Sequence, residues 1–179
     1  MPTETLPLTQ PAVEGQCMLS PRVEARMVQD LQLQATDKVL EIGTGSGFSA
    51  ALMARLAQEV LSLEIDPALA SKARTHLMQA GLNNVDVRQA DAAANDFAAC
   101  RAAAPFNAIL LSGSVTEVPA SLLQLLAVGG RLIAITGDEP MMRATLITRA
   151  SDTAFHTTQP WDTVAPRLLN FPQPSRFHF

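Results

Sequence analysis

The chain has 179 residues, a length that suits one domain with a hydrophobic core of its own. Hydrophobic residues make up 47% and charged residues 17%, which is a globular composition and excludes a disordered chain. The formal net charge is -4 and no run of Lys or Arg stands out, so we expect neither a nucleic acid nor an anionic membrane as a partner.

The N-terminal end reads differently from the rest. Residues 1–16 are expected to form an extended arm, because Pro2, Pro7 and Pro11 disfavour a helix. Residues 17–179 are expected to form a single domain. The two cysteines are far apart and lack metal-ligand spacing, which argues against a zinc site and for a reducing compartment. With no signal peptide and no apolar stretch of ~20 residues, a cytoplasmic protein is predicted.

From Pro21 onward, helical and strand-like patterns alternate. A helix begins at Pro21, with an apolar face that includes Met27 and Leu31. The expected strands cover 38–42, 60–64, 84–88, 108–111 and 131–135, the last after a turn at Gly129–Gly130, with 145–148 a candidate sixth. The expected helices between them cover 48–57, 67–80 and 121–126. This alternation predicts a Rossmann-like α/β fold, with a mostly parallel central sheet and helices on both faces. The tail from Gln159 has no clear assignment.

The most informative segment is Val39–Phe48, a strand followed by a GxGxG turn that opens a helix. Alternate glycines let the backbone turn sharply and approach a ligand, and a loop at a helix start offers N–H groups to an anionic ligand group. Glu41, two residues before the first glycine, would repel a pyrophosphate but suits a cofactor with an ammonium and a sulfonium. Such a charge pair at roughly 4 Å is worth on the order of 4 kcal/mol before desolvation. Charge and spacing therefore favour S-adenosyl-L-methionine over NAD.

Two further acids follow strands in the order this fold requires. Glu64 ends the second strand, where a carboxylate can accept hydrogen bonds from ribose hydroxyls, and Asp91 follows the third, within reach of an adenine amino group. Each acid alone could be a solvated strand end or a partner of a helix dipole. Asp66, before Pro67, is expected to be a helix N-cap. The predicted cofactor-binding residues are Glu41, Ile42, Gly43, Thr44, Gly45, Ser46, Gly47, Glu64, Ile65, Asp91, Ala92 and Ser112.

With these residues the sequence resembles the protein-L-isoaspartate O-methyltransferase family, from about Gly15 to Gly137. The motif Val39–Gly47 is typical of that family, and Pro105–Ile109, Glu117–Pro119 and Val128–Leu132 are similar to further family segments. The resemblance implies a class I methyltransferase fold, S-adenosyl-L-methionine as cofactor and S-adenosyl-L-homocysteine as product. It also implies methylation of the α-carboxyl of isoaspartyl residues in damaged proteins.

The acceptor half departs from the family pattern. Where the family has Gln-Thr-Ile-Ser-Xaa-Pro, this chain has Gln16-Cys17-Met18-Leu19-Ser20-Pro21, so Leu19 stands at the position of the family's serine. Ser20 could replace that serine only if the loop shifts register. Ser112-Gly113-Ser114-Val115 stands where the family has Thr-Ala-Ala-Ala, and Thr163 where its C-terminal motif has arginine. Ser20 and Ser112 are the candidate catalytic residues, and residues 16–20 and 112–114 are expected to face the acceptor.

A serine hydroxyl can orient a carboxylate and a leucine cannot. The sequence therefore predicts a methyltransferase with an altered acceptor site, its acceptor being a protein or peptide carboxylate or a small molecule. A non-catalytic module that keeps the cofactor pocket stays open, and a nicotinamide-dependent oxidoreductase is disfavoured by Glu41 and the GxGxG spacing. Trp161 is a candidate cover for the cofactor cleft, with a packing role equally open.

Overall fold

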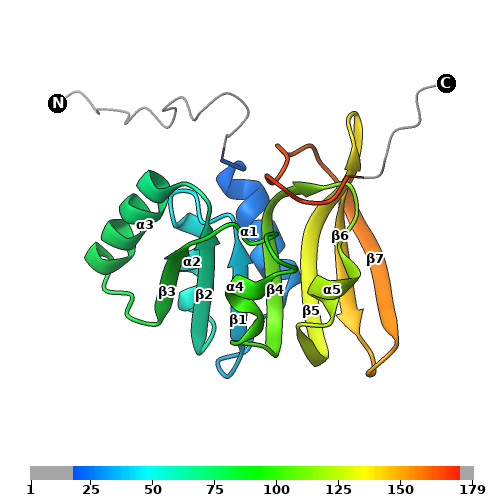
Figure 1. Cartoon of the computed structure of the whole chain (residues 1–179), viewed down its shortest axis with the longest axis horizontal. Coiled ribbons are helices and arrows are strands. Elements are labelled where there is room, and N and C mark those ends of the chain that lie inside the picture. Colours follow the sequence, from blue (N-terminus) through cyan, green and yellow to red (C-terminus); the bar gives the residue numbers. More distant parts are fainter. Residues whose placement is uncertain (1–17, 174–179) are drawn as a thin grey trace.

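The structure is a computed structural model that describes residues 18–173. The predicted arm over 1–16, and with it Gln16 and Cys17, lies outside the described residues. One seven-stranded sheet forms the centre of the described chain, in the order β3-β2-β1-β4-β5-β6-β7 (Figure 1). Among these residues, no helix is long and apolar enough to cross a membrane.

The elements follow the predicted alternation along most of the chain. The strands are β1 (Lys38–Ile42), β2 (Glu59–Glu64), β3 (Val85–Gln89), β4 (Phe106–Val115), β5 (Leu126–Asp138), β6 (Met141–Arg149) and β7 (Phe155–Asp162). The helices are α1 (Pro21–Asp30), α2 (Phe48–Ala54), α3 (Pro67–Gln79), α4 (Ala98–Arg101) and α5 (Ala120–Leu123).

The five strands β1 to β5 are parallel, and β6 and β7 add an antiparallel edge. The predicted Rossmann-like α/β fold with a mostly parallel sheet is confirmed. β1 lies between β2 and β4, so the strand order reverses there, and the crevice beyond the carboxyl ends of these strands is where open α/β sheets bind ligands. The fold thus brings the ends of β1, β2 and β4 together at one edge.

Helices cover both faces of the sheet, as expected (Figure 1). On one face, α1 and α2 supply Met27 and Met53 to a buried cluster with alternate strand residues such as Val39 and Ile133. On the other face, α4 and α5 pack against the intervening residues of the same strands, which include Leu40, Ile109 and Leu132. The two-residue period of each strand therefore divides the core into two layers.

Helix α2 is shorter than predicted: it ends at Ala54 and not at Ala57. The side-chain amide of Asn84 donates to the carbonyl oxygens of Ala54, at 2.8 Å, and Ala57, at 3.3 Å. Asn84, directly before β3, thus donates hydrogen bonds to carbonyl oxygens at the end of the helix that have no helical N–H partner. The local sequence of α2 does not predict this contact, because Asn84 lies 30 residues after Ala54.

Strands β4 and β5 extend beyond their predicted ranges. Residues 112–114 lie within β4, and not after it, because Ser114 and Val115 still pair with β5, and Ser114 also forms a bridge with Arg167. Gly129 and Gly130 lie inside β5, at an irregularity where the pairing with β4 shifts between Leu126 and Arg131 and Gly129 has a φ of 82°, so the predicted turn is an irregularity within a strand. A Cβ at Gly130 would lie 2.8 Å from the Ala127 carbonyl oxygen and 3.0 Å from that of Phe106, which explains the glycine there. The helix expected over 121–126 is shorter in the structure, where α5 ends at Leu123. Leu126 already belongs to β5 and pairs with Phe106 of β4.

The C-terminal third contains elements that the sequence left unassigned. β6 is longer than the candidate strand at 145–148, and β7 occupies part of the tail without assignment. Trp161 lies on β7 and packs on α1: its Nε1 donates to Asp30 at 2.7 Å, and Arg26 lies 4.6 Å above its ring. The packing role therefore holds for Trp161, and it does not cover the glycine loop.

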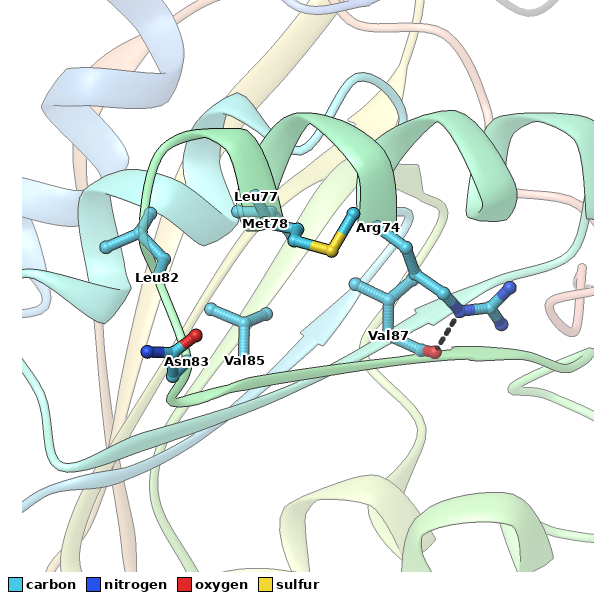
Figure 2. A pocket seen from close by; sticks show the side chains of 7 residues that line it. All are labelled: Arg74, Leu77, Met78, Leu82, Asn83, Val85 and Val87. Carbon is cyan, nitrogen blue, oxygen red and sulfur yellow. Dashed lines mark hydrogen bonds between the residues drawn. The ribbon is translucent and has the colours of Figure 1, made fainter.

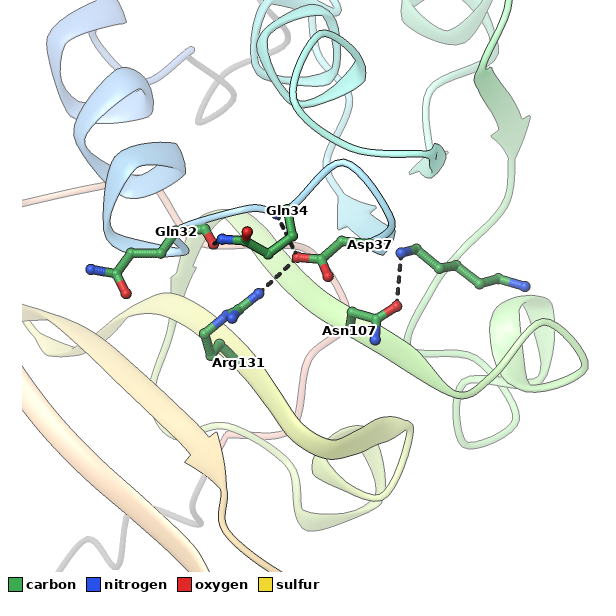
Figure 3. A network of polar contacts seen from close by, with 6 residues as sticks. Gln32, Gln34, Asp37, Asn107 and Arg131 are labelled. Atoms are coloured by element: carbon green, nitrogen blue, oxygen red, sulfur yellow. Dashed lines mark hydrogen bonds and ion pairs between the residues drawn. The ribbon is translucent and has the colours of Figure 1, made fainter.

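A polar network joins the loop between α1 and β1 to β1, β4 and β5 at the amino-terminal edge of the sheet (Figure 3). Asp37 accepts hydrogen bonds from Arg131 Nη2 at 2.8 Å and from the Gln34 backbone N–H at 3.0 Å. The Lys38 N–H donates to Asn107 Oδ1 at 2.8 Å. The Asp37 carboxylate is nearly buried, and the hydrogen bonds from Arg131 and the Gln34 N–H replace those that water would otherwise donate to it.

We expect Arg131→Met to lower the free energy of unfolding by about 2 kcal/mol, between the values for exposed and fully buried ion pairs. The side chains of Arg131 and Asp37 are only 22% and 9% exposed, so the variant leaves a carboxylate unpaired in a poorly hydrated place. Urea unfolding followed by circular dichroism measures the change. Arg88→Met is the matched control, because the Arg88–Asp86 pair is more than half exposed on both sides, and a loss there as large as that of Arg131→Met would contradict the interpretation.

Candidate functional site

The glycine loop leaves β1 at the carboxyl edge of the sheet. Gly43, Gly45 and Gly47 have φ values of 93°, 53° and 86°, the left-handed region that favours glycine. Their N–H groups are all bonded within the chain, to Leu63 O at 2.8 Å, Glu64 Oε2 at 2.8 Å and Thr44 O at 2.9 Å. The N–H groups of the three glycines are thus engaged, and the expectation that the start of this helix offers N–H groups to an anionic ligand stays a prediction. The loop instead offers close backbone approach without side chains.

Glu41 is the most buried polar group at this edge. It is fully buried, and its carboxylate accepts hydrogen bonds from the hydroxyls of Ser49 on α2, Ser62 on β2 and Ser112 on β4. The Ser62 and Ser112 bonds measure 2.5 and 3.1 Å. Burial raises the pKa of Glu41 from 4.5 to about 7, although the three hydroxyls act in the opposite direction. The structure thus brings two of the predicted residues, Glu41 and Ser112, into direct contact.

Sequence reasoning missed Ser49 and Ser62. Thr44, which was predicted, joins the same network through a 2.6 Å contact between its Oγ1 and Ser62 Oγ. A signal for Ser62 did exist, because a serine inside the apolar run Val60–Leu63 must find a buried partner. The partner's identity could not be read from the sequence, since it lies on a neighbouring strand.

Glu64 sits where β2 ends, as predicted, and is 5% exposed. Its two oxygens accept hydrogen bonds from the N–H groups of Gly45, at 2.8 Å, and Asp66, at 3.0 Å. Asp66 caps α3, as predicted, through bonds from the N–H groups of Ala68 and Leu69 to its Oδ1. A carboxylate has about four lone-pair sites, so Glu64 keeps capacity for further donors.

Asp91 follows β3 and is engaged from a distant part of the chain. Its Oδ1 accepts from the Ala93 N–H at 3.1 Å, and its Oδ2 accepts from the Asn170 side-chain amide at 2.7 Å. The remaining predicted cofactor residues line the same edge or the layer beneath it. Ile42 and Ala92 are buried, Ile65 is half-buried, and the Ser46 carbonyl contacts His76 Nδ1 at 3.1 Å.

The segment over residues 163–171, here called the C-terminal segment, crosses the carboxyl edge of the sheet. Ser114 N donates to Pro166 O at 2.7 Å, and Leu168 N donates to Ser114 O at 2.9 Å. Leu168 packs so tightly on the strand ends that a Cβ at Gly113 would lie 2.8 Å from its Cδ2, and one at Gly43 3.2 Å away. A segment that the sequence left unassigned thus forms a wall of the site.

The candidate acceptor residues are only partly brought together. Ser20 is exposed and serves as the N-cap of α1, where its Oγ accepts from the Val23 N–H at 3.4 Å. Leu19 is 5% exposed and packs in the core beside Met27 and Ala165. Ser114 was expected to face the acceptor, and this is wrong: it is fully buried, and its hydroxyl donates to Ala165 O at 2.8 Å.

Sequence reasoning also missed Glu24, on the buried face of α1. It is 6% exposed, and its Oε2 is buried without a hydrogen-bond partner among the described residues. Burial and, second, the charge of Glu41 raise the pKa of Glu24 from 4.5 to about 7. An acid on the same helical face as Met27 and Val28 was the available signal.

A shallow hollow also lies between α3 and β3, lined by Arg74, Leu77, Met78, Leu82, Asn83, Val85 and Val87 (Figure 2). The Arg74 Nε–H donates to Val87 O at 2.9 Å, as Figure 2 shows. β3 is the edge strand of the sheet, so this hollow is separate from the crevice beside β1 and β4. None of the predicted site residues lines it.

Comparison with known proteins agrees with this geometry. The sequence model of the family "Protein-L-isoaspartate(D-aspartate) O-methyltransferase (PCMT)" matches residues 7–164. Protein-L-isoaspartate O-methyltransferase 2 of Marinobacter nauticus is 42% identical over 81% of this chain, and protein-L-isoaspartate O-methyltransferase 1 of Syntrophobacter fumaroxidans is 39% identical over 82%. The chain spans about two thirds of the length of these curated relatives, 65% and 67%.

Solved structures show the same fold. A Plasmodium falciparum protein described as a protein-L-isoaspartate O-methyltransferase, in complex with S-adenosyl-L-homocysteine, superimposes with a TM-score of 0.72 at 19% identity. The match covers 90% of this chain and 81% of that one.

The two buried acids predict an unusual pH dependence of stability. A carboxyl whose pKa is raised in the folded state binds a proton more readily there than in the unfolded chain, so its contribution to stability is lost as the pH rises from about 4.5 to about 7. We expect Glu24→Gln to gain stability relative to the unsubstituted chain between pH values of about 5 and 8, by on the order of a few kcal/mol. Urea unfolding across this range measures the difference, with the exposed Glu59→Gln as control. Parallel pH curves for the unsubstituted chain and Glu24→Gln would refute the prediction.

Proposed function

The chain belongs to the protein-L-isoaspartate O-methyltransferase family, and from that premise we propose that it transfers a methyl group from S-adenosyl-L-methionine to an acceptor. The observation that carries the proposal is the placement of Glu41, Glu64 and Asp91. They lie on or directly after three neighbouring parallel strands, around a loop with three left-handed glycines. In open α/β sheets this edge is where a nucleoside-containing ligand binds.

The residues present fit the proposed cofactor. Glu41 supplies negative charge for an ammonium group, and Glu64 and Asp91 each use two hydrogen bonds, which leaves lone pairs for ribose hydroxyls and for an adenine amino group. Gly43 lets Leu168 pack directly on the loop, since a Cβ there would lie 3.2 Å from Leu168 Cδ2. Ile42, Thr44, Gly45, Ser46, Gly47, Ile65, Ala92 and Ser112 complete the proposed cofactor site.

The protein's own contribution to the reaction would be positioning and exclusion of water. S-adenosyl-L-methionine, when bound, supplies an electrophilic methyl group on a positively charged sulfur. The C-terminal segment covers the strand ends with Leu168, and Ser112 presents its hydroxyl between β4 and Glu41. Alignment of two reactants in such a site can lower a barrier by roughly 7–11 kcal/mol.

We further propose that the acceptor site differs from that of the family's repair enzymes. Leu19, at the position of the family's serine, is buried in the core and offers no hydroxyl, and the exposed Ser20 is engaged as a helix cap. Repair of isoaspartyl residues should therefore be weak. A cytoplasmic site of action, the single domain over 17–179 and the absence of a nucleic-acid or membrane partner stay predictions from the sequence.

The proposal is tested by two measurements on one sample. Isothermal titration with S-adenosyl-L-homocysteine reports cofactor binding, and transfer of labelled methyl from S-adenosyl-L-methionine to an isoaspartyl peptide reports repair. We expect binding together with slow transfer. Absence of binding would overturn the methyltransferase proposal, and transfer at rates ordinary for a repair enzyme would overturn the altered acceptor site. Binding without transfer to any acceptor would favour a non-catalytic module.

The cofactor site predicts a specific loss in Glu64→Gln. We expect its affinity for S-adenosyl-L-homocysteine to fall about 10- to 100-fold, since hydrogen bonds to a charged group contribute about 1.5–3 kcal/mol. Glu59→Gln is the matched control, because Glu59 lies on the same strand at its far end and pairs with Lys38. Equal affinities of both variants for S-adenosyl-L-homocysteine in the titration would remove Glu64 from the proposed site.

A further inference from the structure

We propose that Asn170, together with Asp91, recognises the 6-amino group of the cofactor's adenine, so that the site selects adenine against a purine with an oxygen at that position. The inference rests on the proposed function and deepens it, because it names a residue that decides which nucleobase the same site accepts. Asn170 lies in the tail to which the sequence assigns no element, and beyond residue 164, where the match to the family's sequence model ends.

The C-terminal segment brings Asn170 to the edge of the sheet where we propose that the cofactor binds. The Leu168 N–H donates to Ser114 O at 2.9 Å, and Leu168 Cδ2 lies 3.2 Å from the place of a Cβ on Gly43. Two residues later, the side-chain amide of Asn170 donates to Asp91 Oδ2 at 2.7 Å. The segment therefore contacts β4, the glycine loop and the acid after β3, and Asn170 lies at the nucleobase end of the proposed site.

The chemistry of the pair determines which atom of Asn170 is left for a ligand. An ionised carboxylate accepts hydrogen bonds and donates none, so the amide turns its Nδ2 to Asp91. This is the one hydrogen bond of the Asn170 side chain among the described residues, and the residue is exposed, so its Oδ1 is an accessible acceptor. Asp91 keeps lone pairs on both oxygens beside its bonds to Ala93 and Asn170. The pair thus offers two neighbouring acceptors, an amide oxygen and a carboxylate oxygen.

Two neighbouring acceptors match a group with two N–H donors. The exocyclic amino group of adenine has two N–H bonds and can donate one to each acceptor. A 6-oxopurine has an oxygen in the same place, and its lone pairs would face the oxygens of Asp91 and Asn170. A site built to accept hydrogen bonds rejects an analogue that cannot donate them, because its polar groups are then left unpaired. The pair therefore favours an adenine nucleoside.

Contacts within the chain hold Asn170 in this place. Phe171, the next residue, is 8% exposed, and its ring centroid lies 5.8 Å from that of Phe97. Asn170 has a φ of 63°, and residues 95–97, in the loop after Asp91, have φ values of 48°, 57° and 61°. Residues other than glycine rarely adopt this left-handed region, and backbone strain of this kind persists at ligand sites where the surrounding packing enforces it. A side chain held in this way loses little freedom when it binds a ligand.

Two ligands that differ at the 6-position test the inference. They are S-adenosyl-L-homocysteine and S-inosyl-L-homocysteine, in which an oxygen replaces the amino group. Isothermal titration gives the affinity of the protein for each ligand, and the ratio of the two is the measured quantity, because a general loss of packing at the site lowers both affinities alike. We expect the unsubstituted protein to prefer S-adenosyl-L-homocysteine about 10- to 100-fold, the cost of leaving buried acceptors unpaired. Equal affinities would overturn the inference.

Asn170→Gly assigns the preference to Asn170. Glycine adopts a φ of 63° without strain, so the variant removes the amide and keeps the backbone. We expect its affinity for S-adenosyl-L-homocysteine to fall about 2- to 10-fold, the usual effect of losing one hydrogen bond between neutral groups. Its affinity for S-inosyl-L-homocysteine should not fall, so the preference decreases by the same factor. Asn83→Gly is the matched control and should change neither affinity, because Asn83 is exposed and lines the separate hollow between α3 and β3.

The outcomes separate this inference from the proposed function. An unchanged preference in Asn170→Gly would overturn the inference, and a preference lost in Asp91→Asn alone would assign recognition of the base to Asp91 without Asn170. Tighter binding of S-adenosyl-L-homocysteine by Asn170→Gly would also overturn it, because Asn170 would then compete with adenine for Asp91. Absence of S-adenosyl-L-homocysteine binding by the unsubstituted protein would overturn the proposed function, and this inference with it.

Discussion

The fully buried carboxylate of Glu41 ties together the elements that form the carboxyl edge of the sheet. A charge removed from water must be surrounded by donors, and here they come from α2, β2 and β4, which flank β1 on three sides. The three hydroxyls fix the spacing of these elements at the carboxyl edge of the sheet. Burial nevertheless raises the pKa of Glu41 to about 7, because the three hydroxyls offset only part of the lost hydration. The cost of burying this carboxylate therefore falls at the edge of the sheet where we propose that the cofactor's ammonium group binds.

The same edge is built from distant segments of the chain. The C-terminal segment pairs with Ser114 and packs Leu168 on Gly43 and Gly113, and Asn170 donates to Asp91. Residues more than 50 positions apart therefore share one wall of the crevice. The contacts that stabilise the fold as a whole lie elsewhere. They are the apolar layer on each face of the sheet and the polar network around Asp37 at the opposite edge.

Glu24 and Glu41 together make the stability of the fold depend on pH. Two acids with raised pKa values destabilise the folded chain as the pH rises through about 7, and apolar replacements would be expected to relieve this.

The alternation of helices and strands, the parallel sheet, the GxGxG loop and the three acids at the strand ends could all be predicted from the sequence. These are local signals: apolar periodicity, glycine spacing and an acid directly after a strand each depend on neighbouring residues. The end of α2, the continuation of β4 through Ser114 and the place of Gly130 inside a strand could not be predicted, because each depends on contact with a residue far along the chain, namely Asn84, Ile135 and Phe106. The partners of Glu41, the closed N–H groups of the glycine loop and the isolation of Glu24 are of the same kind. The hydrogen bonds of a side chain and the charges near it depend on how elements pack against one another, so a local sequence pattern does not predict them.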